Sequence, residues 1–273
     1  MISDDRLREV AAALVAVDGV VGVMSGGSRA RGDHVPESDA DLGVYYRPSL
    51  DVAALRALAR ELAGPDAEVT EPGAWGEWVD GGAWLRVDGT AVDWIYRDLD
   101  RVHAAWRDAR RGRHAWYVQV GHPLGFLDVA YAGEVALGVV LADPSGELTA
   151  LHRDTRMYPA LLARSLVARL GEAELTVGIA RKVVDRGDAA YVAGCVFRAV
   201  GLCAHALHAH AGRWAITEKG LVAAAGGLHG APRGFTELAH ALLARVGSSP
   251  VELTATLDAA EALVAEVRAA CAR

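Results

Sequence analysis

Residues 26–44 read Gly-Gly-Ser-Arg-Ala-Arg-Gly-Asp-His-Val-Pro-Glu-Ser-Asp-Ala-Asp-Leu-Gly-Val, and this stretch decides the fold. It follows a short apolar run over residues 20–24, which predicts a buried strand. A strand that ends in a glycine-rich turn before a short helix leaves backbone N–H groups free to bind phosphate oxygens. Gly27 and Ser28 lie in this turn, and Arg31 adds positive charge close to it. The turn is therefore predicted to bind an anion.

Two better-known phosphate-binding motifs do not fit this turn. A P-loop requires Lys and then Ser or Thr after its last glycine, whereas Gly32 is followed by Asp33 and His34. The stretch also lacks the Gly-x-Gly-x-x-Gly fingerprint of dinucleotide-binding folds. Taken alone, a Gly-Gly-Ser turn is more often structural than functional, so the residues that follow it carry the argument.

Asp39 and Asp41 begin a segment that continues as Leu-Gly-Val-Tyr-Tyr, which is typical of a strand. Residues i and i+2 of a strand share a face, so both carboxylates are expected on one side while Ala40 and Leu42 face the core. Two adjacent carboxylates repel each other unless a cation lies between them. Mg²⁺ prefers oxygen ligands and is commonly held by one or two carboxylates together with substrate phosphates. The pair predicts a Mg²⁺ site; the alternative is two solvated acids in an edge strand or loop.

Asp93 interrupts the β-forming run Ala-Val-Asp-Trp-Ile-Tyr at residues 91–96. Asp88 is explained by the tight turn that it forms with Gly89 between two strands, whereas Asp93 has no such local explanation. Facing the paired carboxylates, Asp93 would be a third metal ligand or the general base for an attacking hydroxyl. In isolation, it would more often be an acid on the solvent side of an edge strand.

The rest of the N-terminal part alternates helical and strand patterns. The predicted elements are helices at residues 4–17, 52–62 and 98–111 and strands at residues 20–24, 39–46, 83–87 and 90–96. This pattern indicates an α/β (α+β) domain with a small mixed β-sheet over residues 1–111.

Residues 112–273 are rich in alanine and leucine and keep a helical period. The predicted helices span residues 122–133, 147–168, 172–186, 188–211, 217–225, 234–246 and 250–271, with breaks at glycine and proline clusters. The second domain, residues 112–273, is therefore predicted to be an all-helical bundle.

Charge and composition narrow the partners of this 273-residue chain, whose net charge is −7. Residues 1–110 hold 20 acidic and 12 basic residues, a balance that suits a divalent cation or a cationic substrate and argues against a nucleic-acid surface. No run of about 18 uncharged apolar residues predicts a membrane span, and the N-terminus lacks the apolar region of a secretion signal. The three cysteines have no metal-binding spacing and are expected to be reduced, which indicates a cytoplasmic protein.

The Gly-Ser turn, the paired-Asp strand and the later single Asp together resemble the DNA polymerase β superfamily of nucleotidyltransferases. The stretch over residues 26–43 is similar to that of small bacterial enzymes, namely the aminoglycoside and lincosamide nucleotidyltransferases and the minimal nucleotidyltransferase antitoxins. The motifs cover residues 26–43 and 91–96, and a helical domain after the sheet also agrees with the family.

The resemblance implies a role for each motif residue. Gly27 and Ser28 would contact the triphosphate, Asp39 and Asp41 would bind two Mg²⁺ ions, and Asp93 would be the third carboxylate. Several drug-modifying relatives use a glutamate as the catalytic base, and Asp93 is one methylene shorter. Whether Asp93 acts as the base therefore stays open.

The helical domain is expected to form the other wall of the cleft. Only Lys182 and Lys219 are lysines among the 28 basic residues, and a compact ammonium suits phosphate. Related enzymes place a lysine of the helical domain on the nucleotide, so both lysines are candidate nucleotide ligands, as is Tyr191, which is expected at the same helix junction as Lys182. The alternative for each lysine is a surface charge.

These residues predict transfer of a nucleoside monophosphate, with ATP the expected donor among NTPs, to a hydroxyl of a small acceptor, with release of pyrophosphate. An aminoglycoside-like antibiotic is one acceptor that fits the acidic N-terminal half. Two alternatives stay open: a protein- or tRNA-directed adenylyltransferase of the antitoxin type, and a non-catalytic nucleotide-binding module.

Overall fold

The computed structural model describes residues 2–27 and 39–272, and these residues form two compact units. The first unit comprises residues 1–108 and 115–157, and the second comprises residues 109–114 and 158–273. The elements of the first unit are α1 (Asp4–Leu14), β1 (Val20–Ser25), β2 (Ala40–Tyr46), α3 (Val52–Ala63), β3 (Gly82–Val87), β4 (Thr90–Asp98), α4 (Leu99–Arg110), β5 (Trp116–Gln119), β6 (His122–Leu127), α5 (Ala130–Leu137), β7 (Val139–Ala142) and α6 (Glu147–Thr155). The last two residues of α4 fall in the second unit.

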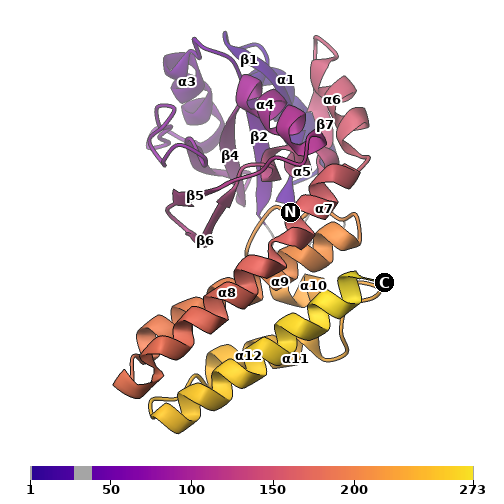
Figure 1. The fold of residues 1–273 in the computed structure, drawn as a ribbon. Coiled ribbons are helices and arrows are strands. Elements are labelled where there is room, and N and C mark those ends of the chain that lie inside the picture. The colour runs from indigo at the N-terminus through magenta and orange to yellow at the C-terminus, as the bar shows by residue number, and fades with distance from the viewer. Residues whose placement is uncertain (1, 28–38, 273) are drawn as a thin grey trace. The chain divides into compact units, whose positions relative to one another are not determined.

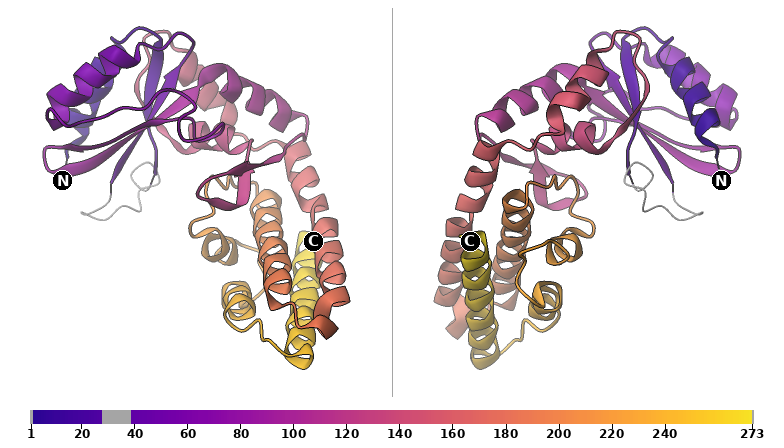
Figure 2. Two further views of the ribbon diagram at one scale, coloured as in Figure 1. Left: turned by 90° about the vertical axis from the view of Figure 1, so that its left-hand side faces the viewer. Right: turned by 90° about the vertical axis from the view of Figure 1, so that its right-hand side faces the viewer.

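A five-stranded mixed sheet organises the first unit, with strand order β3-β4-β2-β1-β7 (Figures 1 and 2). Strands β2 and β4 are parallel, and the other neighbours are antiparallel. Period-2 alternation places Leu42 of β2 and Trp94 of β4 in a hydrophobic core with Leu7 of α1 and Leu55 of α3. One face of the sheet is therefore buried under α1 and α3, and Asp41 and Asp93 belong to the opposite face.

Part of that opposite face is covered through a buried ion pair. Arg97, at the end of β4, donates two hydrogen bonds, of 2.6 and 2.8 Å, to the carboxylate of Glu134 on α5. The guanidinium of Arg97 also lies 5.1 Å from the ring centre of Tyr131, next to α5's first residue. This bidentate contact joins α5 to the sheet, and removing one partner would leave an uncompensated buried charge.

The structure of residues 115–142 differs from the helix that was predicted over residues 122–133. Strands β5 and β6 form a two-stranded hairpin in which Tyr117 pairs with Phe126, and helix α5 begins only at Ala130. Trp-Tyr-Val at residues 116–118 favours a strand, and Gly121 at φ 83° permits the tight turn. The helix prediction was wrong here because Pro123 and Gly125 disfavour a helix interior, and pairing with β5 gives this segment its strand conformation.

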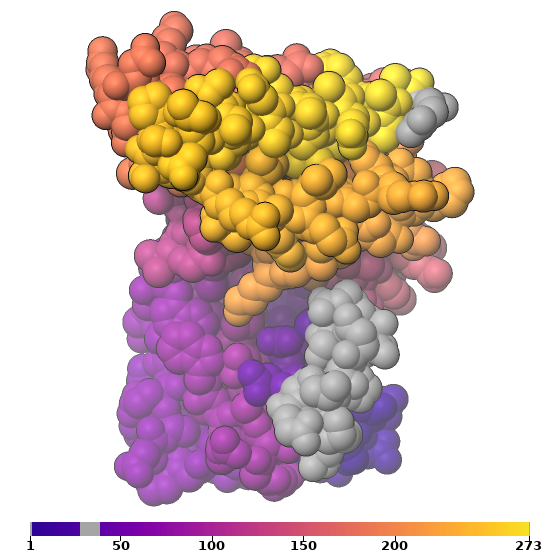
Figure 3. Space-filling view, turned by 90° about the horizontal axis from the view of Figure 1, so that it is seen from below, coloured from indigo at the N-terminus to yellow at the C-terminus, as the bar shows by residue number. Residues whose placement is uncertain are grey.

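The second unit is helical, as predicted. Its elements are α7 (Ala160–Ala168), α8 (Leu170–Ala180), η1 (Arg181–Arg186), α9 (Ala189–His210), α10 (Leu221–Gly226), α11 (Phe235–Ala244) and α12 (Pro250–Cys271). Helix α9 is long and apolar enough to cross a membrane, but 67% of its most apolar window is buried, because α7, α8, α10 and α12 pack around it. Figure 3 shows α11 and α12 side by side on the surface of this unit. Helix α9 is thus the core helix of the bundle.

The fold class is confirmed: a mixed α/β region with a five-stranded sheet is followed by a helical region. The division between the units differs from the predicted boundary at residue 111, because residues 115–157 group with the sheet. The expected helix over 147–168 is two helices in different units, since Pro159 removes a backbone donor where α6 would continue into α7.

Candidate functional site

The parallel pairing of β2 with β4 places two of the three predicted carboxylates side by side. In this register Asp41 lies opposite Asp93, and Leu42 lies opposite Trp94. Neighbouring strands are about 4.8 Å apart, so the side chains of Asp41 and Asp93 start from adjacent positions on one face. Both are partly exposed, whereas the alternate residues Leu42 and Trp94 are fully buried. The sheet thus presents two carboxylates together at the open part of its face.

The glycine turn packs directly on the first of these carboxylates. The backbone N–H of Gly26 donates a 2.8 Å hydrogen bond to the backbone carbonyl of Asp41. Gly27 has φ 63°, and a Cβ there would overlap Oδ2 of Asp41 and lie 2.9 Å from its Cγ. Glycine is needed here both for its backbone conformation and for the space beside the carboxylate. The structure therefore brings Gly27 and Asp41 into contact.

Three predicted site residues lie at the margin of this arrangement or outside it. Ser28 and Arg31 lie outside the described residues. Asp39 is exposed and precedes β2 by one residue. Within residues 2–27 and 39–272, no group of three or more His, Cys, Asp or Glu side chains is arranged as a metal site. The structure places Asp41 beside Asp93, and the place of Asp39 in a metal site stays a prediction.

The donor set that remains still fits Mg²⁺. This ion is usually held by one or two carboxylates and completes its shell with water and substrate phosphates. Asp41 and Asp93 supply two hard oxygen donors, and the space that a Cβ at Gly27 would fill lies beside one of them. The fit is to an ion shared between the protein and a phosphate substrate, rather than to an ion enclosed by protein ligands.

Trp84 extends the row of residues beyond Asp93. In the antiparallel pairing of β3 with β4, Trp84 lies directly opposite Asp93, so the two share a face. Residues Asp41, Asp93 and Trp84 therefore form one row across β2, β4 and β3. The Trp84 side chain is 69% exposed and stacks on Trp75, with ring centres 4.2 Å apart and planes 17° apart.

The sequence contained the signal for this row, although Trp84 was not singled out as a site residue. Asp88-Gly89 is a two-residue turn, which fixes the hairpin register from Val87 and Thr90 outward. Counting back along that register pairs Trp84 with Asp93, and the alternation of β3 puts Trp84 on the face opposite the core.

The segment that carries Trp75 is held in place by several polar contacts. Gln119 of β5 donates a 2.6 Å hydrogen bond to the Trp75 carbonyl and accepts one from the Trp78 N–H at 3.1 Å. Asp80 is buried and accepts hydrogen bonds of 2.8 Å from Gly73 N–H and from the Tyr46 hydroxyl. These contacts order the backbone on both sides of Trp75 and so fix its ring against Trp84.

Lys182, Tyr191 and Lys219 all lie in the second unit and are exposed. Lys182 is in η1, and Tyr191 lies in the first turn of α9, where its N–H donates to the cap Asp188. Lys219 follows the opposite end of α9, and that helix of 22 residues is about 33 Å long. Lys182 and Tyr191 are close in the chain as expected, but the two lysines belong to opposite ends of one helix. The role of each lysine as a phosphate ligand stays a prediction.

The second unit also contains buried histidines that do not belong to the predicted site. Burial, together with His208, His114 and Arg198, lowers the pKa of His205 on α9 to about 3. Burial likewise lowers the pKa of His208 and of His114. Burial thus favours the neutral form of these histidines, of which His205 and His208 are buried residues of α9.

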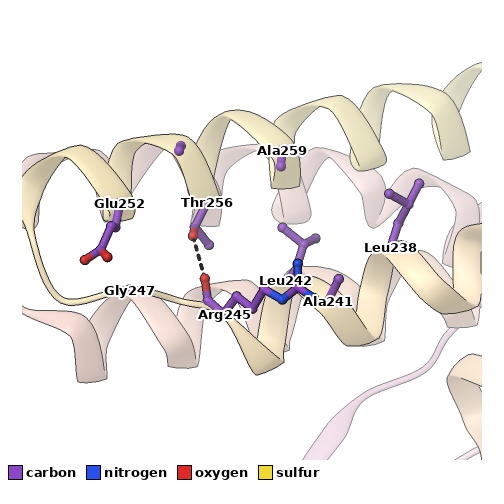
Figure 4. Close-up of a pocket in the computed structure, with 9 residues that line it drawn as sticks. Leu238, Ala241, Leu242, Arg245, Gly247, Glu252, Thr256 and Ala259 are labelled. Carbon is purple, nitrogen blue, oxygen red and sulfur yellow. Dashed lines mark hydrogen bonds between the residues drawn. The ribbon is translucent and has the colours of Figure 1, made fainter.

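A groove of about 510 Å³ lies between α11 and α12 of the second unit (Figure 4). Its walls are mostly apolar, with Leu238 and Leu242 on one helix and Ala259 on the other. The polar groups at its end are engaged in the fold, since Glu252 accepts from Ser249 in a capping box and Thr256 donates to the Arg245 carbonyl. None of the predicted site residues lines this groove.

Comparisons with known proteins bear on the sheet-containing region. Residues 5–72 match the family model described as a nucleotidyltransferase domain. No curated protein matches the chain. Among solved structures, the chain is similar to a nucleotidyltransferase-like protein from Exiguobacterium sibiricum, with 13% identity, a TM-score of 0.48, and coverage of 96% of this chain and 74% of the other.

The matched segment contains the turn at Gly27 and the carboxylates Asp39 and Asp41, whereas Asp93 lies beyond it. Asp93 nevertheless lies opposite Asp41 of the matched segment, because β4 pairs with β2. The Asp41–Asp93 pair therefore includes one residue of the segment that is similar to the nucleotidyltransferase domain family.

Proposed function

We propose that this protein transfers AMP from ATP to a hydroxyl of a small-molecule acceptor and releases pyrophosphate, in a reaction that depends on Mg²⁺. The observation that carries the proposal is the in-register pairing of Asp41 with Asp93 beside the Gly26–Gly27 turn. A glycine turn, which lets a phosphate approach the backbone, is suited to the triphosphate, and two adjacent carboxylates are suited to the cation that accompanies it.

Each residue of the site has a defined task in this proposal. Asp41 and Asp93 would hold the ion between them, and Asp39, two residues before Asp41, would serve a second ion. When bound, Mg²⁺ lowers the pKa of the acceptor hydroxyl and neutralises charge on the triphosphate and the leaving pyrophosphate. The Gly26–Gly27 turn orients the phosphates, so that positioning and charge neutralisation provide most of the rate.

Asp93 has two candidate roles, and the proposal is that it combines them. As a ligand it would fix the ion at the point where β4 adjoins β2. As a base it would accept the proton of the acceptor hydroxyl or orient that hydroxyl toward the phosphorus. A short carboxylate on a strand reaches little beyond the ion that it binds, so orientation of the hydroxyl is the part of the base role that we assign to it.

The acceptor that fits best is a hydroxylated, amine-bearing compound such as an aminoglycoside-like antibiotic. Residues 1–110 hold 20 acidic and 12 basic residues, a balance that attracts a cation toward this unit. A protein- or tRNA-directed adenylyltransferase is the second candidate, and a long helical unit after the sheet counts against the small antitoxin type. A non-catalytic module is the third, and the retention of both paired carboxylates counts against it.

The direct test incubates the full chain with Mg²⁺, each of the four labelled NTPs and a panel of hydroxylated antibiotics, with mass detection of the product. We expect one acceptor to gain the mass of a nucleoside monophosphate, with ATP the preferred donor. Asp41→Asn should reduce the rate at least 100-fold, and Asp93→Asn should reduce it by about 10²–10⁴. Asp66→Asn, an exposed turn carboxylate of the same unit, is the matched control. Full activity in both site variants would refute the mechanism.

A further inference from the structure

Trp84 is a large exposed side chain whose position is fixed on one side only. It is 69% exposed, yet one face of its ring is stacked on Trp75. The segment around Trp75 is anchored by Gln119 and Asp80, so the stack is held by the fold rather than by solvent-side contacts. An ordered indole with one covered face and one open face can bind a ligand with little loss of side-chain freedom.

The register of the sheet sets the place of Trp84 relative to the carboxylates. The row across the sheet runs from the Gly26–Gly27 turn at the end of β1 to Asp41, Asp93 and Trp84. Two strand spacings, about 10 Å, separate the backbone of Asp41 from that of Trp84. Trp84 is therefore at the opposite end of the row from the turn.

The geometry of phosphoryl transfer indicates which end of this row of residues faces the acceptor. Attacking and leaving oxygens lie roughly in line on opposite sides of the phosphorus. The proposed function places the triphosphate, and hence the leaving pyrophosphate, over the turn beside Asp41. The acceptor hydroxyl must then approach from the side of β4 and β3, which is the side of Trp84.

The charges around Trp84 indicate the kind of acceptor. The segment at residues 71–80, which carries Trp75, contains Glu71, Glu77 and Asp80 and no Lys or Arg. Tryptophan is also the aromatic residue that attracts a cation most strongly through its ring face. Asp80 is buried, Glu71 pairs with Arg56, and Arg86 shares the face of Trp84, so it is the open indole face that favours an acceptor with a protonated amine.

We infer that Trp84, supported by Trp75, is the acceptor-binding platform of the site and selects hydroxylated ring compounds that carry an amine. The inference rests on the proposed function, because the direction of attack is defined by where the triphosphate binds. The bond that forms joins the acceptor oxygen to the α-phosphorus, the bond that breaks releases pyrophosphate, and the hydroxyl proton passes toward Asp93 or solvent.

The test measures two affinities separately by calorimetry on the full chain. The probes are Mg²⁺ with a non-hydrolysable ATP analogue, and then kanamycin, streptomycin and spectinomycin added to the nucleotide-loaded protein. Trp84→Ala should weaken binding of the aminated probe that the wild type binds by about 5–30-fold, the range of a cation–π contact, and change nucleotide affinity less than 2-fold. Trp84→Phe keeps an aromatic face and should recover most of the loss. Leu175→Ala, at a side chain 63% exposed on α8, is the control for loss of an exposed apolar group.

The outcomes separate this inference from the function on which it rests. A wild type that fails to bind nucleotide contradicts the proposed function itself. A wild type that binds nucleotide but none of the three aminated probes contradicts the acceptor platform alone. Weaker nucleotide binding in Trp84→Ala would assign the indole to the nucleobase and overturn the inference. Unchanged affinity of Trp84→Ala for the nucleotide analogue and for the aminated probe would show that Trp84 is a surface residue without a binding role.

Discussion

At the scale of single residues, the site depends on what is missing at position 27. A side chain on Gly27 would occupy the space of the Asp41 carboxylate, and φ 63° is a conformation that residues with a Cβ adopt at a cost of about 1–2 kcal/mol. The absence of a side chain at Gly27 and the position of the carboxylate of Asp41 are therefore two parts of one arrangement. Substitution at either residue should disturb the same function.

Gly27→Ala should lower the rate of nucleotidyl transfer at least 10-fold, because the new methyl group must displace the Asp41 carboxylate. The matched variant is Gly26→Ala, whose Cβ would meet nothing closer than 3.9 Å and should cost much less activity. Steady-state transfer assays, with thermal unfolding to check the fold, measure both. Equal losses in the two variants would show that the contact with Asp41 does not matter.

The sequence predicted the positions of single residues correctly where their spacing along a strand or a turn determines the direction of the side chain. The two-residue period of a strand and the Asp88-Gly89 turn depend only on local backbone chemistry. Asp93 could be placed on a strand, but its position opposite Asp41 required the parallel pairing of β2 with β4. That pairing joins segments about 50 residues apart, and no local pattern encodes it.

At the scale of elements, the strongly periodic helices and the four strands between residues 20 and 98 were predicted well, whereas β5, β6 and β7 were missed. Helix α9, expected at residues 188–211, spans Ala189–His210. Strand β7 was missed because Val-Val-Leu-Ala at residues 139–142 is only four residues long and follows a helix rich in alanine. Its strand conformation comes from pairing with β1, where Val139 lies opposite Ser25, and this contact is not visible in local sequence.

Helix α9 also determines how the second unit should respond to acid. The pKa of His205 is lowered to about 3, chiefly by burial, whereas an unfolded histidine titrates near 6.5. The unfolded chain therefore binds more protons than the folded chain between about pH 6.5 and 3, and stability is lost as pH falls through that range. Each such histidine contributes a slope of at most about 1.4 kcal/mol per pH unit.

Urea unfolding followed by helical circular dichroism at pH 7.0, 5.5 and 4.5 measures this effect. We expect the free energy of unfolding to fall with pH in the wild type and to fall less steeply in His205→Gln. His210→Gln, at an exposed position of the same helix, should keep the slope of the wild type. An unchanged slope in His205→Gln would show that this histidine does not control the acid response.

At the scale of the whole molecule, the amino-acid composition predicted a different division into units from the one that long-range contacts define. Alanine-rich sequence begins near residue 112, yet residues 115–157 group with the sheet through β5, β6, β7 and α5. The chain enters the second unit at Ala109, returns at Ala115 and leaves the first unit finally after Met157. A domain boundary read from composition marks a change of secondary structure, whereas the compact units are set by long-range packing.

The second unit's part in the reaction is the least determined by sequence. Lys182 and Lys219 were each a candidate phosphate ligand or a surface charge, and Lys182 lies in η1 before α9 whereas Lys219 follows that helix. Neither compositional rarity nor helical spacing could distinguish them, because both lie on exposed segments with no register to fix them.

The central claim is that Asp41 and Asp93 act as one site for a metal-bound nucleotide, and calorimetric titration with a non-hydrolysable ATP analogue tests it most directly. The wild type should bind the analogue in Mg²⁺ and lose at least 10-fold in affinity when EDTA replaces the ion. Asp41→Asn and Asp93→Asn should each lose at least 10-fold in Mg²⁺, whereas Asp66→Asn should bind as the wild type does. Nucleotide affinity that is unchanged by EDTA and by both site substitutions would contradict the account.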